Sequence, residues 1–256
     1  MSVLKAHLRK PSLWNRTIVG HVHSVFTHVV NLLMNTPEGD ILLTVVPEGE
    51  LLPDSLEATS YVLCALRSCQ LGTPVCWMPG SLCWSGHFAS VMLDVWTGRM
   101  PRTRFRWYGK DIYTLNVSAE KEQMVGESLR AILRALEEKR QDQAVEAAHS
   151  IIGLGGGLTP AADDALTGAL AVFCTFNECF PFLTEELLAR TTIVSTRYLQ
   201  CAQHGFFSQR VISLMTAEQV EQSTAAISLC EWGGTSGQDT LYGIVLAQRY
   251  FSSHKE

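Results

Sequence analysis

The chain has 256 residues, which is enough for one large domain or two modest ones with a buried core. Apolar residues make up 46% and charged residues 18%, and this composition excludes a disordered protein. The net charge of −5, without a long run of Lys or Arg, disfavours a nucleic-acid partner. The apolar stretches are too short for a signal peptide or a membrane span, so we expect a cytoplasmic protein without a membrane partner.

The first part of the chain is predicted to form mainly β-strands. Its candidate strands are short, rich in β-branched and aromatic residues, and separated by turns that contain Pro or Gly. They cover residues 17–26, 40–46, 74–78, 87–95, 103–108 and 111–117. Residues 55–69 are the exception, because the apolar spacing of Leu56, Leu63 and Leu66 favours a helix.

From Ser118 onward the pattern changes to helices. Residues 118–137 carry one apolar face opposite a charged one, which is typical of an amphipathic helix. Further helices are expected over residues 142–152, 160–176, 184–204, 207–214, 216–233 and 236–251, with Thr216 and Gln219 forming a capping box. Strands followed by helices predict an α+β fold with segregated parts: a β-rich domain over residues 1–117 and an all-helical domain with Gly-rich loops over residues 118–256.

The eight cysteines have no C-x-x-C spacing, and their neighbours are apolar. Without a secretion signal they are predicted to be reduced core thiols rather than disulfides, and clustered zinc-ligand spacing is missing. Histidines 21 and 23 share a strand face, for which we expect structural roles. Arg102, Arg104 and Arg106 alternate along a predicted strand and form either a solvated face or a docking surface for an acidic partner.

Two Gly-rich loops in the helical part resemble each other, at residues 153–164 and 233–239. Each carries a Gly pair, a hydroxyl residue and an Asp in the first turn of the following helix. A helix start offers unpaired N–H groups and a partial positive charge, and glycines let a ligand approach them, so the loops predict a site for a small anion. In the first loop, Thr159 is the expected N-cap and Pro160 the first helical residue.

Neither loop fits a P-loop or a dinucleotide fingerprint. The plain alternative is that the glycines end helices and the acids stabilise the next ones through the helix dipole. In the functional interpretation, Asp163 or Asp164, together with Asp239, holds an amide or amino group, or shares a magnesium ion with phosphate; we favour hydrogen bonding over a metal. Because Asp163 and Asp164 point roughly 100° apart on a helix, we expect only one of them to face the ligand.

These loops carry a family resemblance. Residues 153–164 resemble the Gly-Leu-Gly-Pro-Gly-Leu-Thr-Pro-Ser-Gly-Asp-Asp loop of the AllH-like family, and residues 233–239 resemble its later Gly-x-Thr-Ser-Gly-x-Asp loop. Residues 193–205, which include Ser195, and residues 20–32, with Ser24 and Asn31, are similar to two further family segments. The chain departs from the pattern where Gly156 replaces Pro and where Ala161 and Ala162 replace Ser and Gly.

The resemblance implies a bacterial subunit of oxamate carbamoyltransferase in allantoin breakdown, working with two other subunits. That enzyme exchanges oxalurate and phosphate for oxamate and carbamoyl phosphate, so its ligands are small anions. The expected catalytic residues are Asp163, Asp164 and Asp239, and the expected substrate-binding residues are Gly155, Gly156, Gly157, Thr159, Ser195, Thr235, Ser236 and Gly237. No metal site and no cofactor are expected beyond the magnesium alternative, and a homo-oligomer is allowed. The competing hypothesis is a non-catalytic structural or regulatory subunit.

Overall fold

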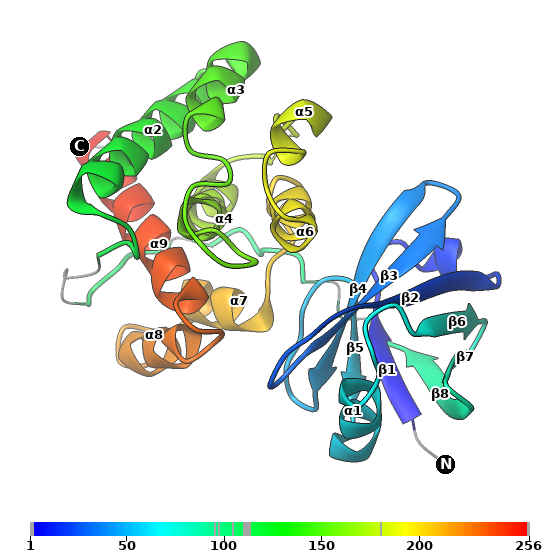
Figure 1. Cartoon of the computed structure of the whole chain (residues 1–256). Helices are drawn as coiled ribbons and strands as arrows, with labels where there is room; N and C mark the ends of the chain where they lie inside the picture. The colour runs from blue at the N-terminus through cyan, green and yellow to red at the C-terminus, as the bar shows by residue number, and fades with distance from the viewer. Residues whose placement is uncertain are drawn as a thin grey trace. The chain divides into compact units, whose positions relative to one another are not determined.

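The computed structural model describes residues 3–94, 96, 98–103, 105–109, 114–179 and 181–254. The chain divides into two compact units, Met1–Gly98 and Arg99–Glu256. The first unit is a β-barrel and the second contains the helices α2 to α9 (Figure 1), which confirms the predicted α+β class.

The first unit closes into a barrel with the strand order β1-β5-β4-β3-β2-β6-β7-β8 (Figure 1). β1 pairs in parallel with β8, as does β4 with β5, and the other neighbours are antiparallel. Alternate side chains such as Leu4, Leu32 and Leu56 point into one apolar core. Its elements are β1 Val3–His7, a 3-10 turn Pro11–Trp14, β2 Ile18–Val25, β3 Val30–Thr36, β4 Gly39–Pro47, β5 Ser55–Ala58, α1 Ser60–Arg67, β6 Pro74–Met78, β7 Ser81–Trp84 and β8 His87–Leu93.

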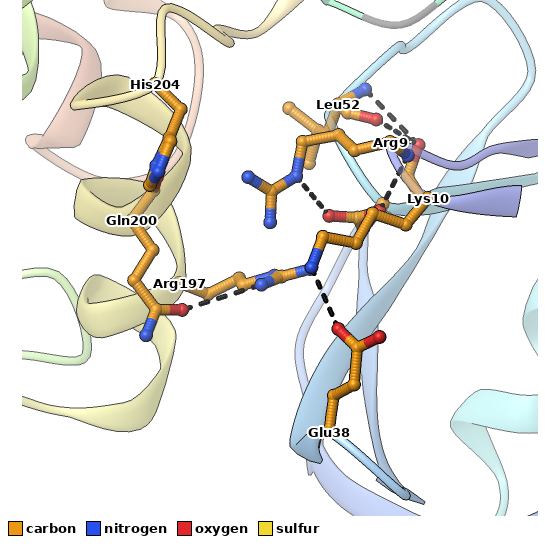
Figure 2. Close-up of polar contacts among 9 residues, drawn as sticks. Arg9, Lys10, Glu38, Leu52, Arg197, Gln200 and His204 are labelled. Atoms are coloured by element: carbon orange, nitrogen blue, oxygen red, sulfur yellow. Dashed lines mark hydrogen bonds and ion pairs between the residues drawn. The ribbon is translucent and has the colours of Figure 1, made fainter. Parts of the chain in front are cut away.

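Polar contacts fix the chain that follows β1. The Arg9 guanidinium donates to Asp54 over 2.6 Å, and Asp54 also accepts from the Arg9 backbone N–H at 2.9 Å. Lys10 Nζ lies 2.8 Å from a Glu38 oxygen, and Figure 2 draws this ion pair. The Asp54 pair is buried on the carboxylate side, whereas the Lys10 pair is exposed and adds little stability.

The predicted strands at residues 17–26, 40–46, 74–78 and 87–95 are confirmed within a few residues, whereas β1, β3 and β7 were not predicted. The single helix over residues 55–69 is wrong at its start, because Ser55–Ala58 pairs with both β1 and β4 and only the remainder forms α1. The strands at 103–108 and 111–117 are also wrong where they are described, since residues 103, 105–108 and 114–117 form none. Arg102 and Arg106 therefore line no strand face; Arg104 and residues 111–113 lie outside the described residues.

The second unit contains α2 Ala119–Glu137, α3 Gln141–His149, α4 Ala161–Phe176, α5 Glu185–Leu188, α6 Ile193–Ala202, α7 Gln209–Thr216, α8 Gln222–Cys230 and α9 Ser236–His254. The single helix predicted over 184–204 is wrong, because Thr192 caps α6 by accepting from the Ser195 N–H and so separates it from α5. The capping box at Thr216 is wrong as well. Thr216 ends α7, where its hydroxyl donates to the Ile212 carbonyl over 2.8 Å.

Helix α4 is buried along nearly its whole length and packs most extensively against α9. Two glycines allow this close approach. A Cβ at Gly168 would lie 2.0 Å from the Thr240 carbonyl oxygen, and a Cβ at Gly243 would lie 1.8 Å from the Ala165 carbonyl oxygen. The packing therefore brings the first turns of α4 and α9, which follow the two Gly-rich loops, close together.

One disulfide corrects the expectation of reduced cysteines. Cys174, in the last turn of α4, is bonded to Cys179, and their Cα atoms lie 5.5 Å apart. Helix α4 ends at Phe176, so the chain turns there and brings Cys179 back to the helix end. The other six cysteines are free, as expected, but only Cys201 is a buried core thiol: Cys64 is exposed, and Cys69, Cys76, Cys83 and Cys230 are partly exposed. Within the described residues, no helix combines the length and the hydropathy that a membrane crossing requires.

Candidate anion site at two helix starts

The two Gly-rich loops, at residues 153–164 and 233–239, meet in the structure. Thr159 Oγ1 and Ser236 Oγ lie 2.5 Å apart, 77 positions distant along the chain. Thr159 is therefore not the N-cap that its position predicted: Pro160 holds the cap position, and the Thr159 hydroxyl faces the start of α9 instead. Ser236 is the first residue of α9. The hydroxyl pair joins the starts of α4 and α9.

The loop glycines fall into two groups. Gly156, Gly157 and Gly234 have no heavy atom within 4 Å of the place that a Cβ would take, so this side of both loops is open. By contrast, a Cβ at Gly155 would lie 2.5 Å from the Ala161 nitrogen, and one at Gly237 would lie 1.8 Å from the Leu229 carbonyl oxygen. At Gly155 and Gly237 the absence of a side chain lets a neighbouring backbone segment pack closely. Only the first group leaves room for a ligand to approach the backbone.

Asp163 is buried and fully engaged with its own chain. Its carboxylate accepts from the Gly153 N–H at 2.8 Å, from the Thr191 hydroxyl at 2.5 Å and from the Ser195 hydroxyl at 2.6 Å. Burial raises the pKa of Asp163, and these three hydrogen bonds offset part of the rise. The carboxylate thus ties the first loop to the start of α6. The Ser195 hydroxyl is committed to Asp163.

Asp164 points to the other side of α4, toward the hydroxyl pair. It is hydrogen-bonded with Thr159 and Ser236, while its Oδ2 has no hydrogen-bond partner within the described part of the chain. Burial holds the pKa of Asp164 well above its usual range, and the nearby Asp239 and Asp163 raise it further. As expected from the helix geometry, the two neighbouring aspartates face different surroundings.

Asp239, in the first turn of α9, is fully buried. Its Oδ1 accepts from the Asn116 N–H at 2.8 Å, and its Oδ2 has no hydrogen-bond partner among the described residues. Burial raises the pKa of Asp239, whereas bonds from Asn116 and Thr235 lower it in part. The site thus contains two buried carboxyl oxygens, one on Asp164 and one on Asp239, that are free to take a ligand's hydrogen-bonding group.

Asn116 is the site residue that the sequence did not indicate. Its N–H holds Asp239, and its side-chain amide donates to the Thr235 hydroxyl over 3.3 Å. It precedes α2 and lies 123 positions before Asp239, within a stretch predicted as a strand. No local pattern marks such a residue, because only the tertiary fold brings it to the start of α9.

Polar side chains in β2 and around α6 bond to residues close to them in sequence. His23 Nδ1 lies 3.2 Å from the Ser24 hydroxyl in the barrel, and His204 Nδ1 lies 2.8 Å from the Gln200 carbonyl oxygen at the end of α6. Arg197 lies within α6 and donates to Gln200 over 3.5 Å (Figure 2). In the described ranges, no three His, Cys, Asp or Glu side chains gather as a metal-ligand set.

The raised carboxyl pKa values predict how stability depends on pH. A carboxyl whose folded-state pKa lies above the ordinary 3.8 holds its proton in the folded state after the unfolded chain has lost it. Its contribution to stability is complete below that value and is lost as the pH rises through the folded-state pKa. The Asp239→Asn variant keeps an acceptor for Asn116 and cannot ionise. We expect its free energy of unfolding near neutral pH to exceed that of the wild type by on the order of 1 kcal/mol.

Thermal melts of the two proteins between about pH 4 and pH 8 measure this gain. The difference should grow as the pH rises. Asp142→Asn, at an exposed acid in the first turn of α3, is the matched control and should show a constant difference. A constant difference for Asp239→Asn would mean that Asp239 titrates normally in the folded protein.

Models of known protein families match both parts of the chain. A family model described as oxamate carbamoyltransferase subunit AllH matches residues 151–248, which include the hydroxyl pair and the three aspartates of the site. A second model, described as the AllH family N-terminal domain, matches residues 2–95, which contain the barrel. No solved structure matches the chain. With most of its length covered by these two models, the chain belongs to the AllH family.

Proposed function

We propose that this chain is the subunit of an oxamate carbamoyltransferase that binds a small anion where α4 and α9 begin. The family description names such a subunit. The observation that carries the location is the pair of hydroxyls on Thr159 and Ser236, 2.5 Å apart, with Asp164 bonded to both. Two helix starts, two hydroxyls and an open glycine backbone provide donors at one place.

The electrostatics of this site need explanation, because ionised aspartates would repel an anion. The raised pKa of Asp164 and of Asp239 extends the pH range over which each carboxyl stays neutral in the folded protein. A neutral carboxyl carries a proton and donates a hydrogen bond, so it can line an anion site that a carboxylate would oppose. Anion binding at this site is therefore expected to be coupled to proton retention.

The two ends of a carbamoyl ligand differ, and the site offers a different partner for each. Phosphate oxygens would accept from the backbone at Gly156 and Gly157 and from the Thr159 and Ser236 hydroxyls. The unpaired Oδ2 of Asp239, which carries the proton of the neutral acid because Oδ1 accepts from Asn116, would donate to the carbonyl oxygen of the ligand's carbamoyl group. Asp163 is left out of ligand contact in this arrangement, since its oxygens are already bonded within the chain.

Calorimetry of the full chain with phosphate, carbamoyl phosphate, oxamate and oxalurate tests this proposal. We expect binding of phosphate or carbamoyl phosphate that Asp239→Ala and the double variant Thr159→Val/Ser236→Ala weaken at least tenfold. Asp142→Ala, at the exposed first turn of α3, is the matched control and should bind as the wild type does.

If binding survives in both site variants, the anion lies elsewhere. If neither the chain nor a complex reconstituted with its partner subunits binds any of the four ligands, the proposal is wrong. Should the complex turn over carbamoyl phosphate equally well with Asp164→Ala and Asp239→Ala, the chain is a non-catalytic structural or regulatory subunit.

A further inference from the structure

Asp164 is the best-placed proton carrier of the described chain. It is 7% exposed, its Oδ2 has no hydrogen-bond partner among the described residues, and its bonds run to Thr159 and Ser236. The two hydroxyls are half-buried and lie beside the open side of the glycine loops. Asp164, the hydroxyl pair and the open loops therefore form a continuous polar path from the helix core to the surface of the site.

We propose that Asp164 moves the proton of carbamoyl transfer through the Thr159–Ser236 hydroxyl pair. This inference rests on the proposed function and adds a chemical role to one residue of the site. Asp239 differs from Asp164 in this respect, since its bonds run to Asn116 and Thr235 rather than to the pair. The Asp163 carboxylate is instead taken up by Gly153, Thr191 and Ser195, none of which belongs to the pair.

The proton balance of the reaction needs such a group. The attacking amide nitrogen forms a C–N bond with the carbamoyl carbon, and the C–O bond to phosphate breaks. The nitrogen loses one proton, and the leaving phosphate oxygen gains one. Asp164 starts as the neutral acid, gives its proton through a hydroxyl to the phosphate oxygen, and recovers a proton from the nitrogen. No further reactant is required, and Asp164 ends in its starting form.

The surroundings of Asp164 favour the acid form at the start of the cycle. The groups that act on it are the carboxyls of Asp163 and Asp239 and the hydroxyls of Thr159 and Ser236. The carboxyls and burial oppose a negative charge, whereas the hydroxyls only partly offset them. An anionic ligand beside the path would oppose the charge further, so binding prepares the acid for transfer.

The test is the pH dependence of kcat in the complex reconstituted with its partner subunits. For the wild type we expect kcat to fall as the pH rises through one ionisation. Asp164→Asn should lower kcat on the order of 100-fold and remove that ionisation, while carbamoyl phosphate still binds within a few-fold of the wild-type affinity. The Thr159→Val/Ser236→Ala variant cuts the path with Asp164 intact and should lower kcat by a similar factor.

Asp142→Asn should leave kcat and its pH profile unchanged, as the matched control at an exposed helix start. A wild-type complex that turns over, with Asp164→Asn retaining both kcat and the ionisation, would overturn the proton role and leave the proposed function standing. A wild-type complex without carbamoyl exchange would overturn both. If Asp164→Asn fails to fold, the double hydroxyl variant decides, because it leaves all three aspartates in place.

Discussion

Replacing Gly243 by alanine is expected to destabilise the helical unit by about 3 kcal/mol or more. The added Cβ would lie 1.8 Å from the Ala165 carbonyl oxygen and 2.7 Å from its carbon, both backbone atoms of α4. Backbone cannot move aside as a side chain can, so α4 and α9 must separate. Separation would also pull apart the helix starts that carry the hydroxyl pair, and ligand binding should weaken with stability.

Gly126→Ala is the matched control for this prediction. Gly126 also lies within a helix, α2, but its Cβ would first meet the Tyr242 hydroxyl at 3.2 Å, at the end of a side chain. Alanine favours a helix over glycine by about 1 kcal/mol, so this variant should be close to the wild type or more stable. Chemical denaturation of both variants measures the two effects. Equal stability of Gly243→Ala and the wild type would mean that the helices do not cross at this distance.

Replacing Asp163 by alanine is expected to lower the free energy of unfolding by about 3 to 5 kcal/mol. Three donors, on Gly153, Thr191 and Ser195, would lose their acceptor, and the Ser195 hydroxyl is buried. A donor buried without a partner costs more than the bond itself contributes. The loss should loosen the first loop from α6, while the hydroxyl pair keeps its own bond to Asp164.

A double-mutant cycle separates this role from a catalytic one. Asp163→Ala and Ser195→Ala should each destabilise the chain, and their combination should cost less than the sum, with a coupling of about 1 to 3 kcal/mol. Denaturation of the four proteins gives the coupling. A chain in which Asp163→Ala keeps its stability but the complex loses turnover would restore Asp163 to the catalytic role that its position in sequence suggested.

Much of the fold could be predicted from periodicity. The amphipathic spacing of α2 and the apolar length of α4 identify those helices, and the long second strand was found as well. The predictions that were wrong concern elements whose structure depends on contacts with distant parts of the chain. Leu56 shares a helical apolar spacing with Leu63 and Leu66, yet Ser55–Ala58 forms a strand because β1 and β4 flank it on both sides. The Cys174–Cys179 bond depends on how the chain turns after α4, which local sequence does not specify.

The site was predictable in part because its loops repeat one arrangement. The Gly pairs, hydroxyls and aspartates of the two loops indicated a shared place, and Thr159 and Ser236 do meet. The sequence could not divide the aspartates by role, because Asp163 finds partners near the start of α6, on Thr191 and Ser195, whereas Asp164 finds one on the second loop, Ser236. Nor could it find Asn116, whose two contacts both depend on the fold.

The measurement that tests the central claim most directly is proton uptake on phosphate binding. Calorimetric titrations in two buffers of different ionisation heat, repeated between about pH 6 and pH 8, give the number of protons taken up. Asp164→Asn serves as the reference, because subtracting its uptake removes the contribution of phosphate itself. We expect the wild type to bind phosphate more tightly at lower pH. With the titrations extended upward to the pH at which the ligand-free protein begins to lose the Asp164 proton, it should take up more protons than Asp164→Asn. Equal uptake by the two proteins at every pH, or binding that neither Asp164→Asn nor Thr159→Val/Ser236→Ala alters, would contradict a site lined by neutral acids at the starts of α4 and α9.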